Sequence, residues 1–151
     1  MKALPMRLGI ISLWILAAGC SQPVKTVPSR GVIKTNKGQP CEKALIVFHP
    51  TDTKRINDPK PLAVADGTGA FVVRTFTTDD GAIPGEYGVT VVWPSSVTEG
   101  EKPKMPLFGE EGSSGGGPDR LKGKYGNPKQ PRIKITIPSG GDPNLSIQVE
   151  E

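Results

Sequence analysis

The chain has 151 residues, of which 35% are hydrophobic and only 5% aromatic, and it carries a formal net charge of +4. This length allows one domain of ordinary size and not two. The 19 Gly and 16 Pro exclude a protein built from long helices, because both residues break helix interiors.

The N-terminus has the pattern of an export signal. Lys2 and Arg7 precede an uncharged, mainly apolar run at 8–18, and the small residues 17–19 lead directly to Cys20. The run is too short to span a bilayer, which takes about 20 residues, and its length suits a signal peptide. An ordinary secretory signal followed by a coincidental cysteine is the alternative interpretation.

The residues L-A-A-G-C at 16–20 resemble a bacterial lipobox, although Ala17 stands where a larger aliphatic is preferred. The resemblance implies removal of a signal peptide at 1–19 and lipidation of Cys20. Several acyl chains, such as palmitate, would hold the protein firmly at a membrane. Ser21 after the cysteine implies an outer membrane lipoprotein that faces the periplasm or the cell surface.

Cleavage would also change the charge balance, because Lys2 and Arg7 would be lost and 17 basic residues would remain against 15 acidic ones. No basic stripe with interleaved aromatic residues is evident. Nucleic acid is therefore not an expected partner.

A proline-containing tether over 20–30 precedes a domain predicted to cover 31–151. Alternation of apolar and polar residues between turn residues predicts seven strands, at 31–36, 44–49, 62–65, 71–76, 86–93, 132–137 and 145–149. In the second strand, for example, Ala44, Ile46 and Phe48 are expected to point inward and His49 outward. Polar outer faces and the lack of a helical period favour a single antiparallel β-sandwich.

The pattern fails over 94–131, which is rich in Gly, Pro and charged residues. A loop of this length is usually either functional or disordered. Its composition favours a mobile excursion, and the alternative is a partner-binding loop that uses Leu107 and Phe108 as candidate contacts.

Several short motifs occur in an order that resembles the carboxypeptidase regulatory-like, transthyretin-like domain found in small lipoproteins of planctomycete-type bacteria. They are A-x-I-x-F-x-P at 44–50, D-x-x-G-x-F at 66–71, P-G-x-Y at 84–87 and L-x-x-K-Y at 121–125. The resemblance implies a Greek-key topology and an exported, non-catalytic module without a cofactor. The glycines and prolines of these motifs are folding signals, and they carry little functional information.

No catalytic, cofactor-binding or metal-ligating residue is predicted, and the chain is not expected to be an enzyme. His49 is the single histidine, so a His-rich zinc site cannot be assembled. Asp66 and the pair 79–80 could offer oxygen ligands to calcium, but turn chemistry is favoured. Cys41 is interpreted as a small, partly buried residue, with a free reactive thiol or an intermolecular bridge as the alternatives.

We therefore expect a membrane-anchored envelope lipoprotein whose sandwich is a structural or interaction module, with an envelope protein or polysaccharide as its partner. The alternative is a binding module for envelope polysaccharide or peptide that uses Trp93, Phe108 and Tyr125 as an aromatic platform. A core role for Trp93 and Tyr125 is favoured.

Overall fold

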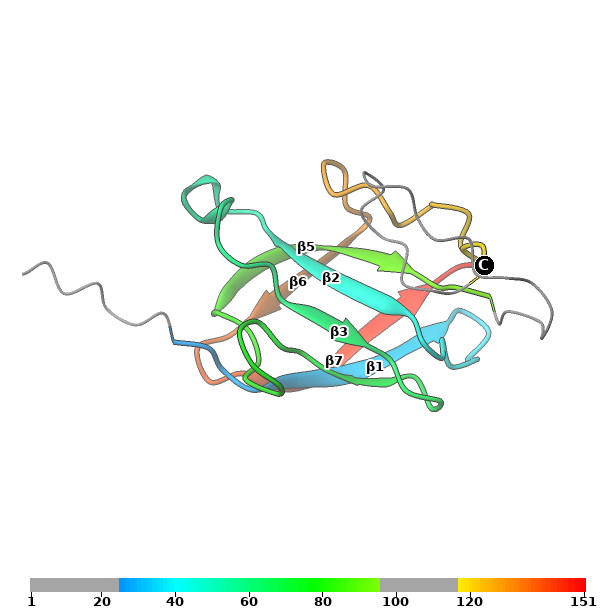
Figure 1. The fold of residues 1–151 in the computed structure, drawn as a ribbon, viewed down its shortest axis with the longest axis horizontal. Helices are drawn as coiled ribbons and strands as arrows, with labels where there is room; N and C mark the ends of the chain where they lie inside the picture. Colours follow the sequence, from blue (N-terminus) through cyan, green and yellow to red (C-terminus); the bar gives the residue numbers. More distant parts are fainter. Residues whose placement is uncertain (1–24, 96–116) are drawn as a thin grey trace, which may run out of the picture.

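The computed structural model describes residues 25–95 and 117–151, which form two packed β-sheets (Figure 1). One sheet has the strand order β4-β1-β7 and the other has the order β3-β2-β5-β6. The strands are β1 (Ser29–Thr35), β2 (Leu45–Pro50), β3 (Leu62–Val64), β4 (Ala70–Val72), β5 (Gly85–Val92), β6 (Ile133–Ile137) and β7 (Asp142–Val149). A single-turn 3-10 helix, η1 (Thr53–Arg55), follows β2. The predicted all-β sandwich of seven strands is confirmed, with antiparallel pairing dominant.

One pairing differs from the antiparallel expectation, because β1 and β7 run parallel, with Val32 opposite Ser146 and Thr35 opposite Val149. Parallel neighbours need a long crossover, and here the crossover is the whole of the domain between its first and last strands. The register shifts between Ser29 and Gly31, where a Cβ at position 31 would collide with the backbone of Leu145. Glycine is therefore required for the close approach of these two strands.

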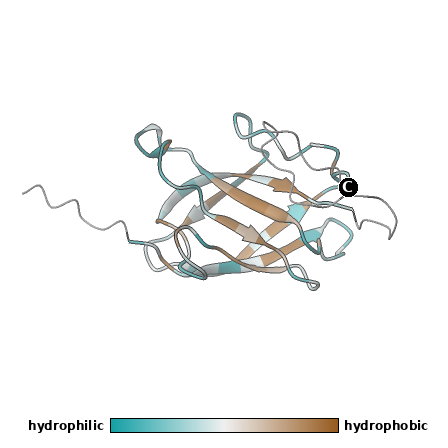
Figure 2. Ribbon diagram, viewed as in Figure 1, coloured by the Kyte–Doolittle hydropathy of each residue, from teal (hydrophilic) through white to brown (hydrophobic). Residues whose placement is uncertain are grey.

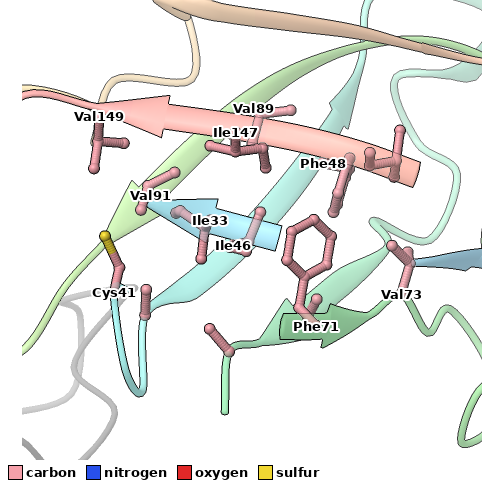
Figure 3. Close-up of a cluster of buried hydrophobic side chains, with 14 of the residues drawn as sticks. Ile33, Cys41, Ile46, Phe48, Phe71, Val73, Val89, Val91, Ile147 and Val149 are labelled. Atoms are coloured by element: carbon pink, nitrogen blue, oxygen red, sulfur yellow. The ribbon is translucent and has the colours of Figure 1, made fainter. Parts of the chain in front are cut away.

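Alternating side chains from both sheets fill the core, as the close-up of Figure 3 shows, and Figure 2 shows that the strands are largely hydrophobic. Ile33 on β1, Ile46 and Phe48 on β2, Val91 on β5 and Ile147 on β7 are almost completely inaccessible to solvent. Burial of large aliphatic and aromatic side chains is the main stabilising contribution in a domain of this size. The predicted inward face of the second strand is confirmed.

β4 is shorter than the predicted strand 71–76, because the chain crosses between the sheets after Val72. The Val73 N–H still bonds to the Ser29 carbonyl on β1, but Arg74 exchanges two backbone hydrogen bonds with Leu62 at the start of β3. This bridge joins the two sheets along their β3–β4 side.

Tyr87, near the start of β5, combines a buried ring with a bonded hydroxyl. Its ring meets Phe48 edge-on at 6.0 Å, and its hydroxyl accepts a hydrogen bond from Arg55 Nη2 at 2.9 Å. Arg55 also donates to the Pro84 carbonyl and to Asp58, so it fixes the η1 turn against β5. The motif P-G-x-Y thus serves the fold.

Residues 117–126 follow the edge of β5 beyond β6. The Arg120 N–H bonds to the Trp93 carbonyl at 2.8 Å, and the Val91 N–H bonds to the Tyr125 carbonyl at 3.1 Å. This segment and β6 therefore line one side of the four-stranded sheet. No helix in 25–95 or 117–151 is long and apolar enough to cross a membrane.

Candidate functional site

An open groove lies on the outer face of the three-stranded sheet. Its floor comes from β1, β4 and β7, and its wall comes from the end of β3 and the loop 74–79. The aliphatic and charged side chains of its lining include Arg30, Val32, Val64, Asp66, Val72, Arg74 and Asp79. Three of them are aliphatic and four are charged.

Exposed valines are the apolar part of this groove. Val32, Val64 and Val72 are 37%, 51% and 44% exposed, although each lies on a strand whose neighbouring residues are buried. Val32 and Val72 are outward residues of the adjacent strands β1 and β4, so alternation alone would favour polar residues there. A cluster of exposed aliphatic side chains at a groove marks an interaction surface better than scattered ones do.

The charged part of the groove is balanced, since Arg30 and Arg74 are matched by Asp66 and Asp79. Such a surface does not select a strongly anionic or cationic partner. A groove that offers aliphatic contacts and charges of both signs is instead complementary to a typical protein surface.

The loop next to the groove adds an exposed aromatic side chain. Phe76 is 54% exposed and lines a smaller hollow, which shares Arg74 and Thr78 with the groove. The apolar surface therefore continues around the β3–β4 side of the sandwich.

The aspartates considered as calcium ligands hold turns. Asp80 accepts backbone hydrogen bonds from Thr75, Phe76 and Thr77 at 2.7–3.2 Å. Although desolvation opposes its ionisation, these donors lower the pKa of the Asp80 carboxyl. Asp66 likewise accepts from Thr68, whose hydroxyl and backbone N–H lower its pKa.

The turn interpretation matches this geometry. No group of three or more His, Cys, Asp or Glu residues that could hold a metal ion occurs within 25–95 and 117–151.

His49 lies half-buried on the outer face of the four-stranded sheet, which agrees with its predicted outward orientation. Its Nε2 is 2.9 Å from the Thr90 hydroxyl on the neighbouring strand β5. The contact makes His49 part of a cross-strand pair.

Cys41 is completely buried beside Ile33, whose carbonyl accepts a hydrogen bond from the Cys41 N–H (Figure 3). Burial raises the pKa of the thiol to about 11, so the reactive thiolate is strongly disfavoured at neutral pH. The structure therefore agrees with the interpretation of Cys41 as a buried residue. It does not agree with a reactive thiol at the surface.

Trp93 and Tyr125 both belong to the core, with exposures of 3% and 8%. The Arg120 guanidinium covers the Trp93 ring at 3.7 Å from its centroid, and the Tyr125 hydroxyl accepts a hydrogen bond from the Glu150 N–H. Neither ring offers a free face to a sugar.

Cys20, Leu107 and Phe108 lie outside the described residues, so lipidation and the proposed loop contacts remain predictions. Sequence reasoning missed the groove, although one signal was present. Alternation places Val32 and Val72 outward, and an outward valine on each of two strands is unusual enough to notice.

No family model, curated protein or solved structure matches this chain.

Proposed function

We propose that this protein is a membrane-anchored envelope lipoprotein of the carboxypeptidase regulatory-like type. Its β-sandwich serves as a non-catalytic interaction module that binds another envelope protein through the outer groove. The observation that carries the proposal is the cluster of exposed Val32, Val64 and Val72 at the groove, bordered by balanced charge.

The anchor is supported by the sequence, in which an 11-residue apolar run and small residues lead to Cys20. The non-catalytic role is supported by the use of polar side chains within the fold. Asp66, Asp80, Arg55 and Tyr87 all bond to turns or to one another in support of the sandwich.

The anchor is tested by metabolic labelling with a palmitate analogue. We expect the wild-type chain to incorporate the label and to fractionate with membranes, and Cys20→Ala to lose both properties. Label retained by the Cys20→Ala variant would refute lipidation at this residue.

The groove is tested by photo-crosslinking in cells that express the full chain. A photoreactive residue at Val72 is expected to capture a discrete protein, whereas the same residue at the exposed Thr136 on β6 should not. Identical patterns from both positions, or capture of polysaccharide alone, would contradict a protein-binding groove.

A further inference from the structure

The side of the four-stranded sheet opposite β3 carries a concentration of positive charge. Between residues 120 and 141 the chain has six basic residues and no Asp or Glu. All six side chains are exposed, and they are Arg120, Lys122, Lys124, Lys129, Arg132 and Lys134. We call this set the cationic edge.

The fold brings these residues to one side of the sandwich. Arg120 and Tyr125 hydrogen-bond through their backbones to Trp93 and Val91, and β6 continues along β5 with Lys134 opposite Gly88. Residues separated by turns in the sequence therefore follow one strand in space. A Cβ at Gly88 would collide with the Pro131 ring, so the connecting turn also packs on β5.

The acidic groups on this side do not neutralise the edge. Glu151 pairs with Arg120, and Glu150 pairs with Lys124 at 2.7 Å. The Asp119 carboxylate accepts hydrogen bonds from the backbone N–H groups of Trp93, Leu121 and Gly123. Glu86 lies further along β5, opposite Thr136.

The six basic side chains of the cationic edge are thus accompanied by only three nearby carboxylates, those of Asp119, Glu150 and Glu151. Lys122, Lys129 and Lys134 form no ion pair with any residue that the structure describes, and Arg132 acts on Glu150 only beyond ion-pair distance.

We propose that the cationic edge binds the anionic phospholipid headgroups of the membrane to which the protein is attached. This inference rests on the proposed lipid anchor, because the anchor brings the domain within reach of the surface. Val27 is the first residue that pairs with the sandwich, and the seven peptide steps from Cys20 span at most about 25 Å. Val27 pairs with Ala82 near the start of β5, whereas Arg120 lies beside Trp93 past its end. The edge therefore meets the bilayer when the domain lies along the membrane surface, because screening limits the attraction to roughly 10 Å.

The edge and the groove lie on opposite sides of the fold. The strand order β3-β2-β5-β6 places the cationic edge at β6 and along the free part of β5, whereas the groove wall lies at β3 and in the loop after β4. Contact between the edge and the bilayer would therefore leave the groove accessible to a partner. A lipid chain and a basic surface together act as two membrane signals.

The test uses the full lipidated chain with Gln130→Cys, an exposed uncharged position in the edge, labelled with a fluorophore. Because Cys41 is buried and Cys20 would be acylated, the new thiol is the labelling site. The protein is reconstituted in phosphatidylcholine vesicles with or without phosphatidylglycerol, and quenching by a headgroup-attached quencher is measured. We expect strong quenching only in anionic vesicles, and its loss at high salt.

Two variants with equal net charge show whether the quenching depends on the cationic edge itself or on the overall charge of the protein. Replacement of Lys122, Lys129, Arg132 and Lys134 by glutamine should lower the quenching about tenfold or more. Replacement of Lys34, Lys37, Lys54 and Lys60, which are exposed elsewhere, should leave it nearly unchanged. Equal losses in both variants, or equal quenching in neutral vesicles, would overturn the proposal.

Flotation with neutral vesicles reports the acyl anchor separately, so a failed anchor and a failed edge give different results. If the edge variant loses binding to an anionic polysaccharide resin while vesicle quenching is absent, the membrane proposal is refuted in favour of a polymer ligand.

Discussion

The two sides of this sandwich are closed by different kinds of interaction. On the β3–β4 side the sheets are joined by main chain, through the paired backbone hydrogen bonds of Leu62 and Arg74. The outward valines there, Val32, Val64 and Val72, are exposed and take no part in this closure. With Arg30, Asp66, Arg74 and Asp79 they line an apolar, charge-balanced groove.

On the β6 side the closure depends on side chains. Arg120 covers the Trp93 ring and forms an ion pair with Glu151, and the Tyr125 hydroxyl accepts a hydrogen bond from the Glu150 N–H. The residues that complete the core are therefore also part of the charged surface. The two sides thus differ in what their surface residues do: the exposed valines on one side lie outside the core, whereas Arg120 on the other side is both a surface charge and a cover for the core.

The largest effect is expected from Trp93→Ala on the β6 side. The substitution removes a buried ring that stacks under Arg120 and donates to the Glu42 carbonyl at 3.0 Å. We expect a loss of about 3–5 kcal/mol in the free energy of unfolding, measured by urea denaturation. Trp93→Phe should lose less, and a loss in the alanine variant below about 1 kcal/mol would contradict the core role.

On the β3–β4 side, Asp80→Ala should cost about 1–2 kcal/mol, because three backbone N–H groups of the 75–77 turn lose their acceptor. The pKa of Asp80 is lowered in the folded state. Its contribution is therefore complete above the unfolded value of about 3.9 and is lost as the pH falls through the folded value.

Asp80→Asn should consequently show a smaller loss of stability between neutral and acidic pH than the wild-type chain does. Denaturation curves recorded at several pH values test this expectation. Parallel pH profiles for the two proteins would show that the Asp80 carboxylate is not the titrating group.

The ion pair between Arg120 and Glu151 should contribute less than about 1 kcal/mol, because both side chains are more than one-third exposed. A double-mutant cycle with Arg120→Gln and Glu151→Gln measures this coupling. Salt should reduce it. A coupling well above 1 kcal/mol that persists at high salt would mean that the pair is effectively buried.

The smallest effect on stability is expected from Val72→Ser in the groove. Val72 is 44% exposed, so the free energy of unfolding should change by no more than about 0.5 kcal/mol. Capture of a partner by a photoreactive residue at the neighbouring Val32 should nevertheless fall strongly. A large loss of stability without a change in capture would indicate a structural role for Val72.

The sequence predicts much of this fold, since alternation locates all seven strands and the inward face of β2. Turn residues such as Asp66 and Gly69 mark strand ends correctly, because their hydrogen bonds are local. The parallel pairing of β1 with β7 is not predictable in this way, because pairing between distant strands leaves no local pattern.

The cationic edge and the groove could not be predicted from the sequence, for a physical reason. The run of six basic residues without an acid between 120 and 141 is visible in the sequence. Its meaning depends on turns that lay the chain along β5. The groove likewise depends on β3 and β4 meeting at Arg74, a contact between two sheets that no periodicity encodes.

The parallel pair formed by β1 and β7 has a consequence for the order of folding. β1 is the central strand of its sheet, yet one of its two neighbours is β7, which follows all the other described strands in the sequence. Until residue 149 is available, β1 has only the three-residue β4 beside it. Formation of that sheet must therefore wait for β7, and such long-range closure makes folding slow.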